Sequence, residues 1–249
     1  MDPITKLSKK QKRLLRNQDP NKMAVIDKLN FKLKQIEPLT QNQKLVYKGL
    51  DKNMLLIGSA GTGKTFLSIY LSLKEIINNP NSPYKKLYIC RSAEPTKSVG
   101  FLPGSLKEKM KIYESPYYAI LTEIFERSDS YDYLKNKQIV EFMSTSYIRG
   151  ITLDNSIVIV DEIQNLEWNE LYAIMTRIGK NCKIIFCGDY KQSDLKTKYS
   201  TDNRKDDILK FIEIIKKMNS FKIVEFNHND IVRSDIVKEF IIISESFNF

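Results

Sequence analysis

Short apolar runs recur along the chain and alternate with longer stretches whose apolar positions follow a helical period. The runs predict six strands, at residues 54–57, 86–90, 139–143, 157–160, 182–187 and 221–226. Helical patterns lie around them, at about residues 40–50, 66–77, 105–125, 168–178, 208–218 and 230–244. Buried strands that alternate with helices are typical of a mostly parallel sheet covered on both faces, so the sequence predicts an α/β fold.

The first 35 residues differ from the rest because they are polar and rich in Lys and Arg. We interpret residues 1–35 as a basic helical extension and residues 36–249 as one domain, since 249 residues accommodate one α/β domain. The opening residues lack the apolar segment of a secretory signal, and no run approaches the ~20 apolar residues of a membrane span. We therefore expect a cytoplasmic protein without a membrane partner.

Composition is that of an ordinary globular protein, with 42% hydrophobic and 28% charged residues. The net charge of +10 suits a nucleic-acid partner, although an excess of Lys, Asn and Ile also fits a coding bias. Cys90, Cys182 and Cys187 lie in apolar runs and are interpreted as buried free thiols. No Cys/His spacing predicts zinc, and His228 is the only histidine.

The strand at 54–57 leads into a glycine-rich loop that fits the phosphate-binding pattern G-x-x-x-x-G-K-[ST] in full. Glycines let successive backbone N–H groups surround a phosphate, and the helix that follows directs its positive end toward the same charge. Lys64 is expected to bridge the β- and γ-phosphates, and Thr65 to bind Mg²⁺. A plain glycine-rich turn before a helix is the alternative. The predicted nucleotide-binding residues of the loop are Gly58, Ser59, Ala60, Gly61, Thr62, Gly63, Lys64 and Thr65.

Two carboxylates, Asp161 and Glu162, end the buried strand at 157–160. We predict that Asp161 binds Mg²⁺ and that Glu162 orients the attacking water. The alternative is that both residues cap the following helix. Ligands of parallel sheets bind at the carboxyl ends of the strands, which favours the first interpretation.

Three further motifs indicate which class of P-loop protein the chain resembles. Residues 161–164, D-E-I-Q, and 188–192, G-D-Y-K-Q, resemble motifs of superfamily 1 helicases and related RecA-like ATPases. This resemblance implies that Gln192 senses the γ-phosphate, with Asp189 supporting the metal-bound water, unless Gln192 is an ordinary loop amide. Thr40-x-x-Gln43 precedes the first core strand, and a glutamine there reads adenine in related ATPases. The same pattern is also a helix capping box.

Residues 91–104, with the string G-F-L-P-G, together with S-Y-I-R-G-I-T-L at 146–153, resemble the PhoH-like family. The resemblance extends over about residues 36–245 and implies a RecA-like ATPase linked to RNA, often assembled in rings, here in a compact phage-type form that would work in the host cytoplasm. Arg91, Lys97 and Arg149 are the residues expected to contact nucleic acid. Arg233 lies in a late V-R segment and is a candidate arginine finger, or else it pairs with Asp230 or Asp235.

Together these observations predict Mg²⁺-dependent ATP hydrolysis coupled to single-stranded nucleic acid, with RNA favoured and helicase or translocase activity as an extension. One RecA-like domain supplies half of the usual nucleotide site, so a hexameric ring is expected. Three alternatives stay open: a regulatory ATPase that does not unwind, a P-loop nucleotide kinase, and a nucleic-acid-binding module whose ATPase is vestigial. Tyr113, Tyr117 and Tyr118 are either base-stacking or, as helical spacing favours, core residues.

Overall fold

A computed structural model of the protein describes residues 32–92, 106–148, 150–189 and 204–247. Within it, Gln35–Phe249 form one compact unit, to which the following description applies. The predicted helical extension falls almost entirely outside the described residues. So do Lys97, Arg149 and Gln192, and their predicted roles stay predictions.

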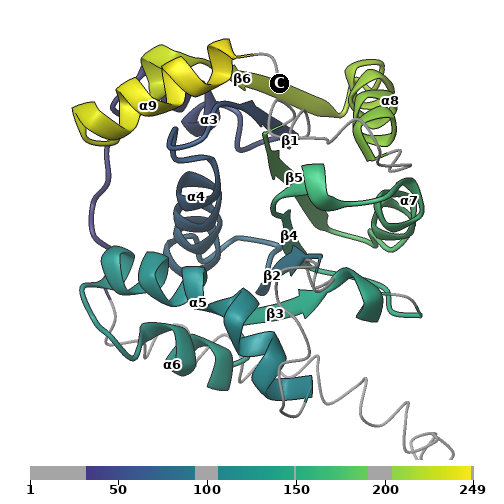
Figure 1. Cartoon of the computed structure of the whole chain (residues 1–249). Coiled ribbons are helices and arrows are strands. Elements are labelled where there is room, and N and C mark those ends of the chain that lie inside the picture. Colours follow the sequence, from purple (N-terminus) through teal and green to yellow (C-terminus); the bar gives the residue numbers. More distant parts are fainter. Residues whose placement is uncertain (1–31, 93–105, 149, 190–203, 248–249) are drawn as a thin grey trace, which may run out of the picture. The chain divides into compact units, whose positions relative to one another are not determined.

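A six-stranded sheet forms the centre of this unit (Figure 1). Its strands stand in the order β3-β2-β4-β5-β1-β6, and every neighbouring pair is parallel. The predicted α/β class with a mostly parallel sheet is therefore confirmed, and so are all six strands. They are β1 (Asn53–Gly58), β2 (Lys86–Arg91), β3 (Val140–Ser144), β4 (Ser156–Val160), β5 (Cys182–Gly188) and β6 (Phe221–Phe226).

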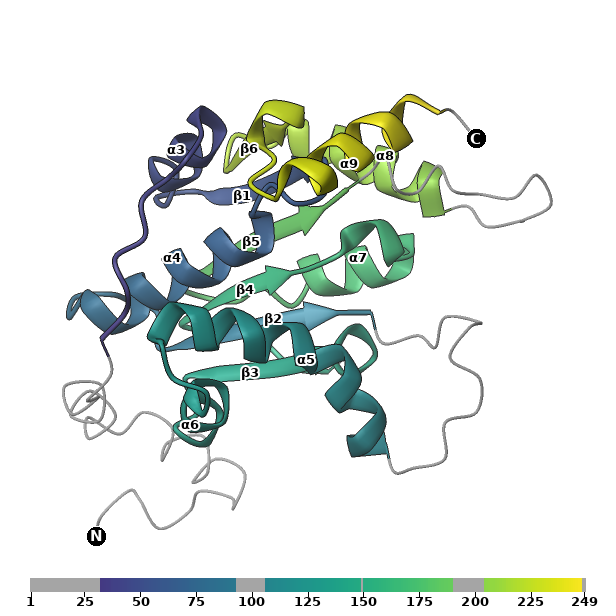
Figure 2. The same ribbon diagram turned by 60° about the vertical axis from the view of Figure 1, so that its left-hand side comes forward.

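Helices lie on both faces of the sheet, as parallel strands require (Figures 1 and 2). On one face α4 runs along the sheet with α5 beside it, and on the other face α7 and α8 pack side by side. The described helices are α3 (Gln41–Tyr47), α4 (Lys64–Asn78), α5 (Leu106–Phe125), α6 (Ser130–Asn136), α7 (Trp168–Met175), α8 (Arg204–Lys216) and α9 (Asp235–Ser246).

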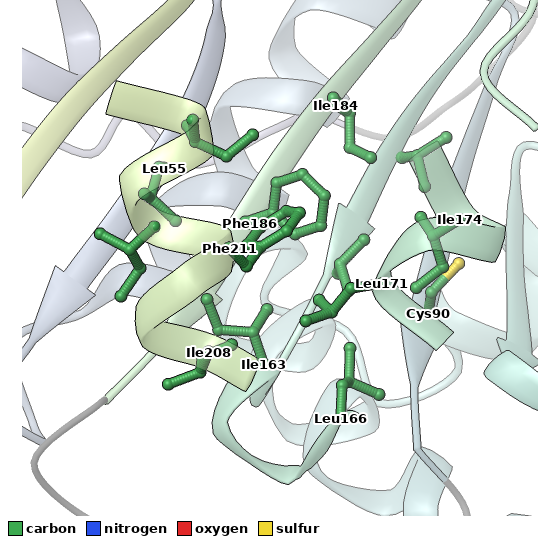
Figure 3. Close-up of a cluster of buried hydrophobic side chains, with 14 of the residues drawn as sticks. Leu55, Cys90, Ile163, Leu166, Leu171, Ile174, Ile184, Phe186, Ile208 and Phe211 are labelled. Carbon is green, nitrogen blue, oxygen red and sulfur yellow. The ribbon is translucent and has the colours of Figure 1, made fainter. Parts of the chain in front are cut away.

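A hydrophobic core fills the space between the sheet and the α7–α8 layer (Figure 3). Phe186 of β5 meets Phe211 of α8 edge to face, with ring centroids 4.8 Å apart. Leu171 and Ile174 of α7 are fully buried in the same cluster. The β4 and β5 strands are buried along nearly their whole length, and the carboxylates Asp161 and Asp189 come directly after their carboxyl ends, where the candidate site lies.

Three helices differ from the sequence prediction, and one of them, α8, begins at Arg204 rather than near 208. Helix α6 was not predicted, and it packs against α5 and β3. Helix α9 begins at Asp235 rather than near 230, because residues His228–Asp230 form a separate 3-10 turn, η5. In that turn the Asp230 carboxylate accepts from the Asn227 backbone, 2.9 Å away, so it caps the turn instead of starting the long helix.

Candidate active site

The glycine-rich loop joins the end of β1 to the start of α4, which is the strand–loop–helix context that its motif demands. Gly58, Gly61 and Gly63 all have positive φ, at 126°, 72° and 86°. At Gly58 a Cβ would lie 2.0 Å from the Phe226 carbonyl oxygen on β6. Glycine is thus required both for the backbone conformation and for the close approach of the neighbouring strand.

Lys64, the first residue of α4, folds back over the loop. Its Nζ donates to the carbonyl oxygens of Gly58 and Ser59, at 2.7 and 2.8 Å. Burial lowers the pKa of this ammonium, and the nearby Asp189 carboxylate offsets that effect only in part. A half-buried ammonium held against the carbonyls of a phosphate loop is suited to receive phosphate oxygens.

Asp161 follows β4 and lies against the loop. Its Oδ1 accepts a hydrogen bond of 2.6 Å from the Thr65 hydroxyl, and its Oδ2 accepts one of 3.0 Å from Tyr117. The residue is 5% exposed, and burial raises the pKa of its carboxyl above the usual range in spite of both hydrogen bonds. A hydroxyl and a buried carboxylate at this spacing are hard oxygen ligands, so the donor set fits Mg²⁺.

Glu162 stands at the turn between β4 and the 3-10 helix η3 (Ile163–Asn165), with a φ of 55°. The left-handed conformation is uncommon for a residue with a side chain, and strained positions of this kind gather at functional sites. Gln164 donates to the Glu162 carboxylate and accepts from the Asp189 backbone N–H at 3.0 Å. One buried amide therefore links the ends of β4 and β5 and orients the carboxylate that we predict to be catalytic.

Gln164 was not among the predicted site residues, although it is the last letter of the D-E-I-Q motif. The position of Gln164 in that motif was the sequence feature that could have identified it as a site residue. Gly188 permits the contact, because a Cβ there would lie 2.4 Å from Ile163 Cγ1 and 2.8 Å from Gln164 Oε1.

Gln43 is buried behind the loop rather than open to a ligand. Its Oε1 accepts from the Leu39 backbone N–H at 2.7 Å, and its Nε2 donates to the Thr62 carbonyl at 3.1 Å. Thr40 caps α3 by accepting from the Gln43 backbone N–H, so one half of the predicted capping box is present; the Gln43 side chain bonds Leu39 in place of Thr40. The amide holds the loop, and a contact with adenine would require it to exchange these partners.

The segment before α9 packs on the glycine-rich loop. The Gly61 carbonyl accepts from the Val232 N–H at 3.0 Å, and a Cβ on Gly61 would lie 2.9 Å from Arg233 Cγ. Within the part of the chain that the structure describes, Arg233 forms no ion pair with Asp230 or Asp235. Its exposed side chain begins beside Gly61 of the phosphate loop.

A second link to the loop comes from the far end of α9. The Glu245 carboxylate accepts from the Ser59 hydroxyl at 3.1 Å and also contacts His228 Nε2 at 2.8 Å. The sequence prediction missed Glu245, since nothing in its local pattern distinguishes it from a surface glutamate.

Asp230 joins η5 to the start of α3. It is 3% exposed and accepts hydrogen bonds from Thr40 at 2.5 Å and from Asn42 at 2.7 Å. Burial alone would raise its pKa, but the hydrogen bonds from the Asn227 backbone, Thr40 and Asn42 outweigh burial and hold the pKa below its usual value. Beside it opens a hollow of about 520 Å³, lined by Leu39, Thr40, Gln41, Asn42, Lys44, Asn227, Asn229 and Asp230.

Replacing Asp230 with Asn should therefore destabilise the fold in a pH-dependent way. The pKa is lower in the folded chain, so this carboxylate stabilises the fold above pH ~4 and loses that effect as pH falls through the folded pKa. We expect Asp230→Asn to lower the free energy of unfolding by about 2 kcal/mol at pH 7 and by much less at pH 3. Urea unfolding at both pH values measures this. The exposed Asp235→Asn is the control, and equal losses at the two pH values would contradict the prediction.

Among the described residues, no group of three or more His, Cys, Asp or Glu side chains is placed so that it could hold a metal ion. No helix in the described ranges is long and apolar enough to cross a membrane.

A parallel sheet with a complete phosphate loop after β1 and a buried aspartate after β4 defines a P-loop NTPase with a RecA-like core. The chain belongs to the PhoH-like protein family, whose family model matches residues 35–245. The family resemblance predicted from the sequence is thus confirmed.

Curated relatives carry the same family name. A PhoH-like protein of Bacillus subtilis (strain 168) is 34% identical over 215 residues, which cover 85% of this chain and 65% of that protein. A PhoH-like protein of Mycobacterium tuberculosis (strain ATCC 25618 / H37Rv) is 28% identical over 228 residues, 90% of this chain and 62% of its own length. The chain thus spans slightly less than two thirds of these relatives. Among solved structures, the S. cerevisiae Hsp104-ADP complex aligns with 98% of this chain and 41% of that chain, with 16% identity and a TM-score of 0.34, a likeness too distant to support an inference.

Proposed function

We propose that this protein hydrolyses ATP in a Mg²⁺-dependent reaction at the loop between β1 and α4. The observation that supports the proposal most directly is the 2.6 Å contact between the Thr65 hydroxyl and the buried Asp161 carboxylate, next to the lysine that opens α4. A loop threonine and a strand-end aspartate are the protein ligands that P-loop NTPases offer to Mg²⁺.

Each side chain at this edge of the sheet has a part in the proposed reaction. Lys64 leaves the loop carbonyls and binds the phosphates, while Glu162, held by Gln164, orients a water and accepts its proton. Mg²⁺, held by Thr65 and Asp161, would supply positive charge to the phosphates. Gln43 is proposed to read adenine in the nucleotide complex, where its amide would exchange the bonds that it now makes with Leu39 and Thr62.

Arg233 is proposed to stabilise the charge that develops on the γ-phosphate, in its own site or in a neighbour's. Its side chain starts from the wall of the phosphate loop, where the Cγ lies beside Gly61. An arginine in this role is worth about 10³–10⁵ in rate in other P-loop enzymes. Gln192 is proposed as the sensor of the γ-phosphate on the basis of its motif.

Single-stranded nucleic acid, with RNA favoured, is the proposed partner of hydrolysis, and helicase or translocase activity is proposed as an extension of that coupling. The net charge of +10 supports such a partner. Arg91 ends β2. Burial raises the pKa of Asp161 and of Tyr117, and Arg91 lies near enough to both groups to oppose part of that rise, so a backbone bound there would lie close to the nucleotide. Lys97 and Arg149 are the other proposed contacts.

A second copy of the chain is proposed to cover α9. The helix has no buried residue, and Ile236, Phe240 and Ile243 recur on one face with exposed fractions of 75%, 71% and 48%. The same helix packs on the phosphate loop through Ile241, so a copy seated on it would add a wall beside the nucleotide that a single RecA-like domain lacks. Repetition of such a contact closes a ring, for which six copies is the proposed number.

Phe240→Asp should therefore weaken self-association. A charge at the centre of the apolar face must be buried in the contact, and we expect the oligomer to dissociate to smaller species at concentrations where the wild type stays assembled. Light scattering or native mass spectrometry of the full chain measures this. The control is Leu209→Asp on α8, which is also exposed. A wild-type chain that hydrolyses ATP as a strict monomer would disprove the ring.

Release of phosphate from ATP, with and without Mg²⁺, tests the proposed chemistry. Hydrolysis should require Mg²⁺ and yield ADP and free phosphate. Transfer of the γ-phosphate to an added nucleoside or nucleotide would instead show a kinase. Phosphate release that depends on Mg²⁺ but on no nucleic acid would favour the regulatory ATPase.

A further inference from the structure

Tyr117 of α5 is a fully buried tyrosine whose hydroxyl reaches the candidate metal ligand. The residue is 0% exposed, and its hydroxyl donates to Asp161 Oδ2 at 3.0 Å. The other oxygen, Oδ1, accepts from Thr65 at 2.6 Å. Each oxygen of the carboxylate therefore has a donor from a different element, one from the phosphate-loop helix α4 and one from α5.

The hydroxyl is the part of Tyr117 that packing does not explain. Its ring lies against Phe142 of β3, with centroids 5.7 Å apart, and a phenylalanine would fill the same space. A buried hydroxyl is costly unless it is hydrogen-bonded, and here its bond goes to the carboxylate. Base stacking by Tyr117, one of the two interpretations from the sequence, is wrong because the ring is inaccessible.

A carboxylate with a single donor can turn about its last side-chain bond, because that torsion has a broad minimum. A second donor on the opposite oxygen limits this rotation. Asp161 is also fixed through its backbone, whose N–H donates to the Cys90 carbonyl of β2 at 2.8 Å. The side-chain torsion is thus the freedom that Tyr117 removes.

We propose that Tyr117 is a positioning residue that holds the Asp161 carboxylate in the orientation required to bind Mg²⁺ together with Thr65. The inference rests on the proposed function. Residues that hydrogen-bond to a metal ligand without touching the metal typically change metal affinity about 10- to 100-fold when they are substituted. Since α5 carries Tyr117, a displacement of α5 would change the orientation of the Asp161 carboxylate through this hydrogen bond. A movement of the helix would therefore change the affinity of the site for Mg²⁺.

The test is the Mg²⁺ dependence of nucleotide binding by Tyr117→Phe, without turnover. A fluorescent, non-hydrolysable ATP analogue is titrated with the full chain in EDTA and at increasing Mg²⁺. We expect the half-saturating Mg²⁺ concentration to rise about 10-fold, while affinity in EDTA stays within twofold of the wild type. The melting temperature of each protein is recorded to confirm that it is folded.

Tyr131→Phe is the matched control. Tyr131 of α6 is also 0% exposed and donates to a carboxylate, Glu114 of α5, at 3.2 Å, but it does not contact Asp161. Equal effects of the two substitutions, or a Tyr117→Phe chain that matches the wild type, would overturn the inference. In an Asp161→Asn background, Tyr117→Phe should have no further effect on Mg²⁺ dependence, and an undiminished effect would also overturn it. A wild type whose nucleotide binding ignores Mg²⁺ would instead contradict the proposed function.

Discussion

Glu162→Gln is expected to slow ATP hydrolysis by about 10²–10⁴-fold and to leave nucleotide affinity within a few-fold of the wild type. Glutamine has almost the same shape as glutamate and can keep a contact with Gln164, but it cannot accept a proton from the attacking water. Steady-state phosphate release measures the rate, and binding of a non-hydrolysable analogue measures the affinity.

The matched control for this prediction is Glu213→Gln. Glu213 is an exposed residue of α8 and forms an ion pair with Lys216 on the same helix. It should hydrolyse ATP at the wild-type rate. If Glu162→Gln kept more than about a tenth of wild-type turnover, another group would have to activate the water, and the assignment of Glu162 would be wrong.

Lys64→Ala is expected to abolish measurable hydrolysis and to weaken nucleotide binding by about 10- to 100-fold, as the loss of a hydrogen bond to a charged group implies. The ammonium now satisfies the carbonyls of Gly58 and Ser59 and would be transferred to the phosphates in the nucleotide complex. Calorimetric titration with Mg²⁺ and a non-hydrolysable analogue gives the affinity directly.

Lys74→Ala serves as the comparison, because Lys74 is an exposed residue of the same helix. It removes one positive charge from α4 and should change neither affinity nor rate. Normal nucleotide binding by Lys64→Ala would mean that this lysine does not meet the phosphates, and equal losses from both variants would indicate a general effect of charge.

The strands and the phosphate loop could be predicted because local sequence patterns specify them. Each strand is an apolar run bounded by turn residues, and the phosphate loop is a contiguous motif whose glycines have the backbone angles that the motif requires. The carboxyl ends of β1, β4 and β5 meet at one edge because parallel strands share a direction, so Lys64, Asp161 and Asp189 were expected together. These features depend on neighbours in the sequence or on the sheet alone.

Contacts between distant segments were not predictable from the same patterns. Thr40 meets Asp230 across 190 positions, and Ser59 meets Glu245 across 186. Tyr117 reaches Asp161 across 44 positions from a helix whose packing on the sheet no periodicity specifies. For Gln43 the motif was visible in the sequence, but its contacts were not. In related ATPases a glutamine at this place reads adenine, whereas in this chain both ends of the Gln43 amide are hydrogen-bonded to the backbone.

The decisive measurement is ATP hydrolysis in the presence of Mg²⁺ with no nucleic acid, with single-stranded RNA and with single-stranded DNA, using Lys64→Ala as the blank. We predict hydrolysis that is absent from the blank and is stimulated by nucleic acid, more by RNA than by DNA. Hydrolysis that is equal in all three conditions would contradict the coupling to nucleic acid, and a wild type no more active than the blank would contradict the ATPase itself.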